Sequence, residues 1–402
     1  MTGPLDSVRV LDFTSMVAGP MATMMLADQG AEVIKLEPPG GELMRHLSYG
    51  RDGMPASFLS CNRNKRSIAV DLKSPQGAEI ARRLIASSAV LVHNFRPGVA
   101  HRMGFGEDEV RAIRSDIIYV SITGFGETGP YAGQRAYDPV VQALSGLAEI
   151  QRDRDTARPR MVRTIIADYT TALTTAQAIT AALFTRERTR QGQHLKIAML
   201  DAMIACLWPE AMPSLTFVGQ EQDPADGEVG PDLVFATQDR YITAGALSDE
   251  EWAGMCRALA REDLIEDPRF KTPRARTKNA VARREITSAE LGKRRADEIL
   301  PRLRANDVPS APVLSRIELL SEPQVLENRI LEEHTSDVLG RIRQPRPAAI
   351  FERTPATIRQ LAPMLGADTE SILGEIGYSA GEIADLERHG IVVRHRSNRP
   401  SE

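Results

Sequence analysis

Residues 8–123 alternate between short apolar runs and longer amphipathic stretches. The apolar runs at 8–14, 31–37, 67–72, 89–95 and 117–123 predict β-strands. The amphipathic stretches at 21–30 and 74–88 predict helices, and Gly30 is typical of a helix end. Strands separated by helix-length segments indicate βαβ units with a parallel sheet, so we expect an α/β fold.

Ligands of parallel sheets bind at the carboxyl ends of the strands. The loops "TSMVAGP", "EPPGG", "NFRPG" and "GFGETGP" all fall at those ends. The last one matches G-x-G-x-x-G, but Pro130 and the turn-like "YAGQRAYD" follow where a dinucleotide-binding loop would open a helix. We therefore interpret it as a glycine-rich turn and expect neither a nicotinamide nor a flavin.

The pattern changes after residue 211. Residues 212–232 are rich in Pro, Gly and Asp, which is typical of a linker. Residues 233–339 combine short strands with charged helices and predict a smaller α+β domain. Residues 340–402 open with a Pro-rich connection and end in two short helices joined at Gly377. The expected organisation is a large domain over 1–211, a linker, a small domain over 233–339 and a return segment over 340–402.

Composition adds mainly exclusions. The chain has 402 residues, is 42% hydrophobic and carries a net charge of −4, so nothing in its bulk charge indicates nucleic acid or an anionic membrane as a partner. The N-terminus has no signal-peptide pattern and no apolar run is long enough to span a membrane, which favours a cytoplasmic location. The three cysteines are scattered and the histidines lack metal-ligand spacing, so we expect no metal site.

Asp168 is the single acid at the start of the apolar stretch "IIADYTTALTTAQAITAALF". Asp is a preferred helix N-cap, and this stretch predicts a helix that begins at Asp168. A helix N-terminus also favours an ionised carboxylate, as a nucleophile requires. The residues alone leave both roles open.

The segment "NRNKRS" (62–67) carries three cations, among them Lys65 and Arg66. One interpretation is a solvated basic loop. The other is a phosphate-binding patch that includes Arg96 and Arg102, since guanidinium groups bind phosphate oxygens in pairs.

Several stretches closely resemble those of the family III CoA-transferases, the group of formyl-CoA and crotonobetainyl-CoA transferases. They include "VLDFTSMVAGPMATMMLADQGAEVIKLEPPGG", "NRNKRSIAVDLKSPQG", "LVHNFRPGVAHRMGFG", "YVSITGFGETGPYAGQRAYDPVVQALSG" and "RQGQHLKIAMLDAM". The likeness continues in order from about Val8 to Val393. It implies a Rossmann-like large domain, and it places the family's catalytic aspartate on Asp168.

The resemblance implies covalent catalysis on acyl-CoA and carboxylic acid substrates. Asp168 would attack the thioester and form a mixed anhydride, then an aspartyl-CoA thioester, and the CoA would pass to an acceptor acid. Coenzyme A enters as part of the substrate, and no metal or redox cofactor is expected. The implied CoA contacts are Met16, Val17, Asn94, Phe95, Arg102, Met103, Arg135, Tyr137 and Met199. A basic residue that formyl-CoA transferases use to contact a phosphate is Pro38 here, and we expect Lys65 and Arg66 to replace that contact.

The resemblance also implies a homodimer of two interlocked, ring-like protomers, in which the C-terminal segment returns to pack on the large domain. One alternative activity shares this fold: α-methylacyl-CoA racemase, which needs two proton-transfer groups. Here those groups would be Asp168 and Asp138. Racemases have a histidine directly before the acid that corresponds to Asp138. This chain has Tyr137 at that position, which is a poor base at neutral pH, so the transferase interpretation is favoured.

Overall fold

The computed structural model describes residues 3–47, 49–153, 156–221 and 233–395. The chain divides into unit 1, over Met1–Glu221 and Ile330–Glu402, and unit 2, over Gln222–Arg329. Each unit has its own hydrophobic core. No helix in the described ranges has the length and apolar character that a membrane span needs.

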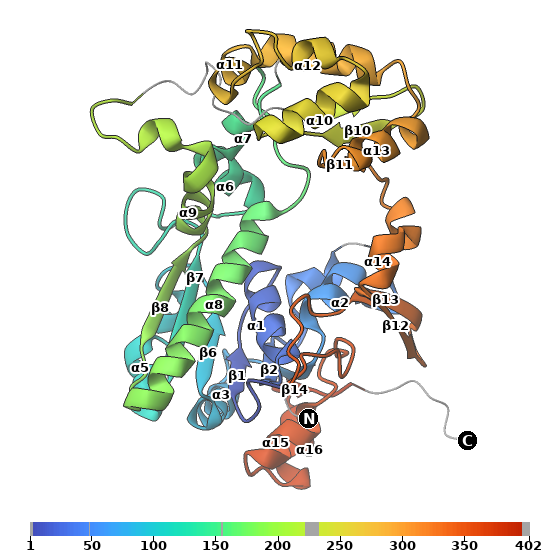
Figure 1. Cartoon of the computed structure of the whole chain (residues 1–402). Coiled ribbons are helices and arrows are strands. Elements are labelled where there is room, and N and C mark those ends of the chain that lie inside the picture. The colour runs from blue at the N-terminus through green and yellow to red at the C-terminus, as the bar shows by residue number, and fades with distance from the viewer. Residues whose placement is uncertain (1–2, 48, 154–155, 222–232, 396–402) are drawn as a thin grey trace. The chain divides into compact units, whose positions relative to one another are not determined.

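A seven-stranded sheet with the order β14-β5-β2-β1-β6-β7-β8 forms the centre of unit 1 (Figure 1). Its strands run parallel except β14, which pairs antiparallel with β5. The bounds are β1 Arg9–Asp12, β2 Glu32–Glu37, β5 Lys65–Val70, β6 Val90–His93, β7 Ile118–Thr123, β8 His194–Ala198 and β14 Val392–Val393. The expected α/β class with a parallel sheet is confirmed.

Helices cover both faces of this sheet. One face packs against α3, α5 and the C-terminal α15 and α16, through side chains such as Leu84, Val110 and Ile372. The other face packs against α1 and α8, through Leu26 and Ile179. The helices of unit 1 are α1 Ala18–Asp28, α2 Ala56–Asn62, α3 Pro75–Ser87, α4 Val99–Arg102, α5 Glu107–Ile113, α6 Asp138–Leu144, α7 Leu147–Ile150, α8 Ile166–Thr189, α9 Met199–Ala211, α15 Thr369–Glu375 and α16 Ala380–Arg388.

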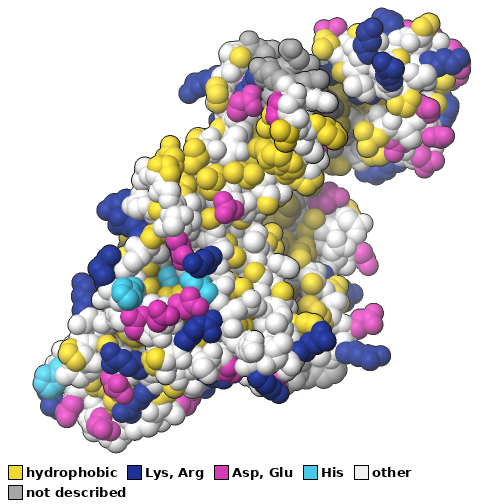
Figure 2. Space-filling view, turned by 90° about the vertical axis from the view of Figure 1, so that its left-hand side faces the viewer, with side chains coloured by type: hydrophobic (Ala, Val, Ile, Leu, Met, Phe, Trp, Pro, Cys, Tyr) yellow, Lys and Arg dark blue, Asp and Glu magenta, His cyan; other side chains and the backbone are white. Residues whose placement is uncertain are grey.

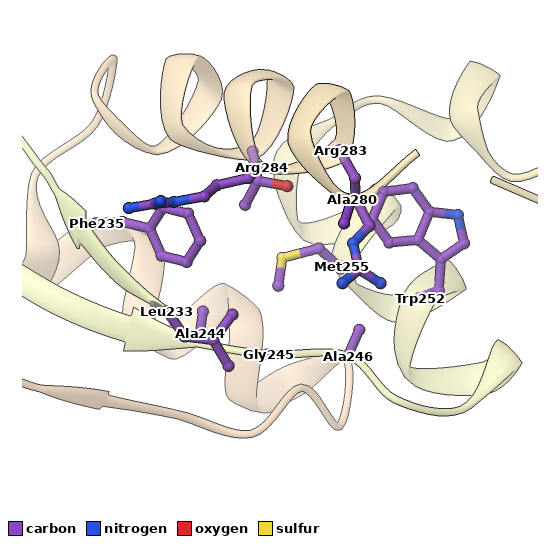
Figure 3. A pocket seen from close by; sticks show the side chains of 11 residues that line it. Leu233, Phe235, Ala244, Gly245, Ala246, Trp252, Met255, Ala280, Arg283 and Arg284 are labelled. Atoms are coloured by element: carbon purple, nitrogen blue, oxygen red, sulfur yellow. The ribbon is translucent and has the colours of Figure 1, made fainter. Parts of the chain in front are cut away.

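Unit 2 is a three-stranded antiparallel sheet with helices packed on it, which is an α+β arrangement. Its elements are β9 Val234–Ala236, β10 Tyr241–Ala244, α10 Asp249–Leu259, α11 Pro273–Lys278, α12 Ala280–Leu291, α13 Ala296–Ala305, β11 Ser310–Pro312 and α14 Pro323–Glu327. Trp252, Met255 and Arg283 line a cavity of about 30 Å³ between α10 and α12 (Figure 3). That volume holds about one or two water molecules, so this cavity is too small for a CoA thioester.

The return of the chain to unit 1 comes earlier than the boundary we expected at 339/340. β12 Leu331–Ser336 and β13 Gly340–Pro345 form an antiparallel hairpin across that point, and both strands belong to unit 1. Hairpin pairing joins strands that are close in sequence, so a boundary between them would split one structural element. Of the expected linker, residues 212–221 lie in unit 1 and residues 222–232 fall outside the described residues.

Candidate active site

A cavity of about 360 Å³ opens in unit 1 at the carboxyl ends of β1, β6 and β7. Its walls come from the β1–α1 loop, the β6–α4 loop, the β7–α6 loop and the first residues of α8 and α9. This is where a parallel sheet binds its ligands, and the volume is within the usual range for small-molecule sites. The lining includes Met16, Val17, Asn94, Phe95, Tyr137, Asp138, Asp168 and Met199.

Most of the residues that the sequence pointed to therefore surround one cavity. Met103 lines a second cavity of about 340 Å³, together with Pro38 and Phe95. Because Phe95 lines both, the two cavities adjoin at this ring. Arg102 and Arg135 have exposed side chains and belong to neither lining.

Asp168 is in the first turn of α8, but it is not the N-cap that we expected. The helix begins at Ile166, and the free N–H groups of Ala167 and Asp168 donate instead to Oδ2 of Asp138, at 2.7 and 3.2 Å. Asp138 lies on α6 and is buried. An acid from another helix thus caps α8, which frees the Asp168 side chain to point elsewhere.

The Asp168 carboxylate accepts a hydrogen bond from the Ala18 N–H at 3.1 Å. Ala18 is the first residue of α1, so the carboxylate of Asp168, a residue of α8, lies against the N-terminus of α1. Burial raises the pKa of Asp168 to about 6, the negative charge of Asp138 adds to this rise, and the Ala18 N–H opposes it. Most of the group is ionised at neutral pH, and its raised pKa makes it a better nucleophile than an ordinary aspartate.

The sequence analysis missed Glu42. Its side chain is buried beneath the β1–α1 loop and accepts the Met16 N–H at 3.0 Å. Asn94 holds the same loop, because its side chain accepts the Ser15 N–H at 3.0 Å and donates to the Ser15 carbonyl at 2.7 Å. The available signal in the sequence was an acid directly after "EPPGG", a loop that was already predicted to lie at the ligand-binding edge of the sheet.

Lys65 and Arg66, for which the sequence predicts a role in phosphate binding, both have acidic partners within the protein. Lys65 is fully buried and donates to Asp12 at 2.9 Å. Arg66 pairs with Glu32 at 2.6 Å and with Glu375 at 2.7 Å. Neither residue lines the two cavities. The signal for Lys65 was Asp12: a charge inside an apolar strand needs a buried partner of opposite sign.

Other cations remain unpaired near the cavities. Arg96 lines the Asp168 cavity, and Arg102 follows in α4. Within the described ranges neither side chain has an acidic partner. A phosphate or carboxylate of a substrate would therefore meet a guanidinium there without competition.

Asp138 is poorly placed for the alternative, proton-transfer chemistry. Its Oδ2 takes the two helical N–H groups and its Oδ1 accepts Nε2 of Gln142 at 2.6 Å. Tyr137 lines the cavity with a half-exposed ring. No group of His, Cys, Asp and Glu side chains that could hold a metal exists in the described part of the chain.

Comparison with known proteins identifies the class. The sequence model of CoA-transferase family III matches residues 5–369. Succinyl-CoA:glutarate CoA-transferase of Mus musculus is 36% identical, covering 98% of this chain and 91% of the mouse protein. Formyl-CoA:oxalate CoA-transferase of Escherichia coli is 30% identical, covering 97% and 99%. This chain belongs to CoA-transferase family III, and it is a CoA-transferase.

Solved structures agree with this assignment. Rv3272 from Mycobacterium tuberculosis has a TM-score of 0.81 and 30% identity, over 92% of this chain and 99% of that one. A CAIB/BAIF family protein from Brucella suis has a TM-score of 0.81 and 29% identity, over 94% and 100%. The resemblance predicted from the motifs is confirmed.

Proposed function

We propose that this CoA-transferase transfers CoA from the CoA thioester of a dicarboxylic acid to a different, free carboxylic acid, through covalent intermediates on Asp168. Succinyl-CoA is the first donor to test. The observation that carries the proposal is the Asp168 carboxylate itself. It lies in a cavity at the sheet's ligand-binding edge with a pKa of about 6. The choice of donor rests on relatives named for succinyl-CoA or succinate, from Mus musculus, Agrobacterium fabrum and Chloroflexus aurantiacus.

In the proposed reaction an oxygen of Asp168 attacks the thioester carbonyl carbon, and the C–S bond breaks. This gives an acyl-aspartyl anhydride and the CoA thiolate. The thiolate then attacks the aspartyl carbonyl, the anhydride C–O bond breaks, and the donor acid leaves as a carboxylate. The acceptor carboxylate reverses both steps on the aspartyl-CoA thioester, which returns a free Asp168 and releases the new acyl-CoA.

The surroundings of Asp168 suit these intermediates. Val17, Ile165 and Met199 line the cavity with apolar atoms, which limits the access of water to an anhydride. The Ala18 N–H that contacts Asp168 can stay on its oxygen as charge develops at the aspartyl carbonyl. For the CoA, we propose contacts with the residues lining the two adjoining cavities, and with Arg96 and Arg102 for its phosphates.

We also propose a homodimer. α1, α8 and residues 344–356 line an open apolar groove of about 910 Å³ within unit 1. Leu173 and Phe184 of α8 are 58% and 66% exposed beside it. Hydrophobic side chains also gather over the part of unit 1 that holds α9 (Figure 2), where Trp208 is 41% exposed. Exposed apolar surface of this extent favours burial against another chain, and light scattering on the purified protein measures the oligomeric state.

The decisive experiment is intact-protein mass spectrometry after incubation with a panel of acyl-CoAs, with hydroxylamine trapping. Wild type should form a CoA adduct or a hydroxamate at Asp168 with its true donor, and the Asp168→Ala variant should form none. If no acyl-CoA gives an adduct while a 2-methylacyl-CoA exchanges its α-proton with deuterated solvent, the covalent mechanism is wrong and racemisation replaces it.

A further inference from the structure

We propose that Glu42 is a positioning residue for the acyl transfer: it holds the β1–α1 loop in the one conformation from which the Ala18 N–H reaches Asp168. The inference rests on the proposed role of Asp168. Glu42 follows β2, and its side chain is 3% exposed. Its Oε2 accepts the N–H groups of Met16 and Met44, each at 3.0 Å.

The loop needs such support because Met16 is strained. Its φ is +69°, in the left-handed region that side chains other than glycine rarely adopt. A residue in this region persists only where its surroundings hold it. The Glu42 carboxylate accepts a hydrogen bond from the Met16 N–H. The Asn94 side chain accepts one from the Ser15 N–H and donates one to the Ser15 carbonyl. The strained residue lies two positions before Ala18.

Ala18 connects this loop to the chemistry. Its N–H makes the hydrogen bond to Asp168 Oδ1 at 3.1 Å, and no other donor contacts that side chain within the described ranges. This bond lowers the pKa of Asp168 against the effects of burial and of Asp138. If Met16 relaxed to a negative φ, the backbone direction at Ala18 would change and the bond would lengthen.

A local role for Glu42 explains only half of its contacts. The carboxylate caps the short turn Leu43–His46 through the Met44 N–H. The bond to Met16 joins residues that are 26 positions apart and has no part in that cap. Glu42 Oε1 has no hydrogen-bond partner in the described part of the chain and lies 3.5 Å from Lys35 Nζ. This ion pair fixes the orientation of a carboxylate whose other oxygen serves the loop.

Several other groups act on Asp168 or line its cavity. Asp138 acts on Asp168 from α6, and the buried Cys61 thiol of α2 is within its electrostatic reach. Arg96 and Tyr137 line the same cavity. Asp138, Arg96 and Tyr137 make no hydrogen bond or ion pair with Glu42 in the described ranges, whereas the charge of Glu42 also acts on the Cys61 thiol. Glu42→Gln removes that charge just as Glu42→Ala does, so a shift in the titration of Asp168 that appears in Glu42→Ala alone reports the loop.

The test compares Glu42→Ala and Glu42→Gln in steady-state CoA transfer across pH. Glu42→Ala should lower kcat by about tenfold or more, with a much smaller change in KM, because it misplaces a group at the reaction centre. It should also move the acid limb of kcat/KM upward by about half a unit or more, because Asp168 loses a donor to its ionised form. The side-chain amide of the Glu42→Gln variant retains an oxygen for both N–H groups, so this variant should recover most of kcat and the wild-type acid limb.

Glu251→Ala is the matched control. Glu251 also accepts two backbone N–H groups, from Leu247 and Ser248, but it lies in unit 2. It should lose stability without any shift of the acid limb. If Glu42→Ala lowers activity with an unshifted acid limb, the inference is wrong and Glu42 is only structural.

Two further variants keep the test decisive. Should Glu42→Ala not fold, the shorter Glu42→Asp keeps the charge near Lys35 but retracts from Met16, and the same shift is expected. Met16→Gly adopts a positive φ without strain. Adding Glu42→Ala to Met16→Gly should therefore lower kcat by a smaller factor than adding Glu42→Ala to the wild type. An equal fall would contradict the inference. Full activity of Asp168→Ala would instead overturn the proposed function itself.

Discussion

Two buried aspartates of unit 1 have opposite electrostatic surroundings. Asp12, at the end of β1, contacts the Lys65 ammonium at 2.9 Å and two threonine hydroxyls, from Thr14 at 2.5 Å and Thr23 at 2.7 Å. Asp168, at the start of α8, contacts one backbone N–H. Burial alone would raise the pKa of Asp12, but Lys65 and Lys35 hold it well below its ordinary value. Burial and Asp138 raise the pKa of Asp168 to about 6.

The difference separates a structural acid from a reactive one. A carboxylate whose charge is fully compensated stabilises the fold and is a weak nucleophile. A carboxylate that is desolvated and faces a second acid is costly to ionise, and an attack on a carbonyl relieves that cost. The chain thus places similar side chains on neighbouring elements and assigns their roles through the charges around them.

Breaking the compensated pair should have the largest effect on stability. Lys65→Met leaves Asp12 buried without its cation, and we expect a loss of about 3–5 kcal/mol in the free energy of unfolding. Urea denaturation at neutral pH measures it. The double variant Asp12→Asn with Lys65→Met should recover much of the loss. If Lys65→Met costs less than about 1 kcal/mol, the pair does not stabilise the fold in the way that its burial indicates.

The uncompensated aspartate should give the opposite sign. Asp168→Asn retains an oxygen for the Ala18 N–H but removes the buried charge, so it should stabilise the protein by up to about 3 kcal/mol. Because the folded-state pKa is raised, the wild-type protein loses stability as the pH rises from about 4 to 6. The gain of the variant should therefore be complete above about pH 6 and absent below about pH 4. A gain that does not depend on pH would contradict the raised pKa.

The acid that faces Asp168 offers a finer test. Asp138→Asn keeps an oxygen to cap α8 and removes the like charge. The pKa of Asp168 should therefore fall by less than about one unit, and the acid limb of kcat/KM should shift to lower pH by the same amount. CoA transfer should survive this change. Asp138→Ala, which also removes the cap, should in addition cost about 1–2 kcal/mol in stability. A complete loss of activity in Asp138→Asn would favour proton transfer by this group.

The smallest effect is expected at the surface. Arg66 pairs with Glu32 and Glu375, both partly exposed, and such ion pairs contribute about 0–1 kcal/mol. Arg66→Gln should lower stability by no more than this, less so at high salt, and leave the KM for acyl-CoA unchanged. Arg96→Gln is the comparison, because its side chain lines the Asp168 cavity and should raise that KM. A raised KM in Arg66→Gln would support its predicted role in phosphate binding.

Much of the fold was predictable because its elements are encoded locally. The strand at 31–37 appears as β2, Glu32–Glu37, and the helix at 74–88 appears as α3 with Ser74 as its cap. The choice of Asp168 and of most cavity residues came from motifs that resemble a known family. The boundary at 339/340 failed because a short hairpin has the same composition whichever unit it joins.

The sequence by itself determined the order of strands and helices, the family and the aspartate to test, because periodicity and motifs are properties of neighbouring residues. Only the tertiary structure decided which charges meet. It paired Lys65 with Asp12, gave the cap of α8 to Asp138, and brought Asp168 to Ala18, 150 positions away in the chain. These contacts set the pKa values of the buried acids, since electrostatic effects depend on distance and burial in space, which no local pattern of residues encodes.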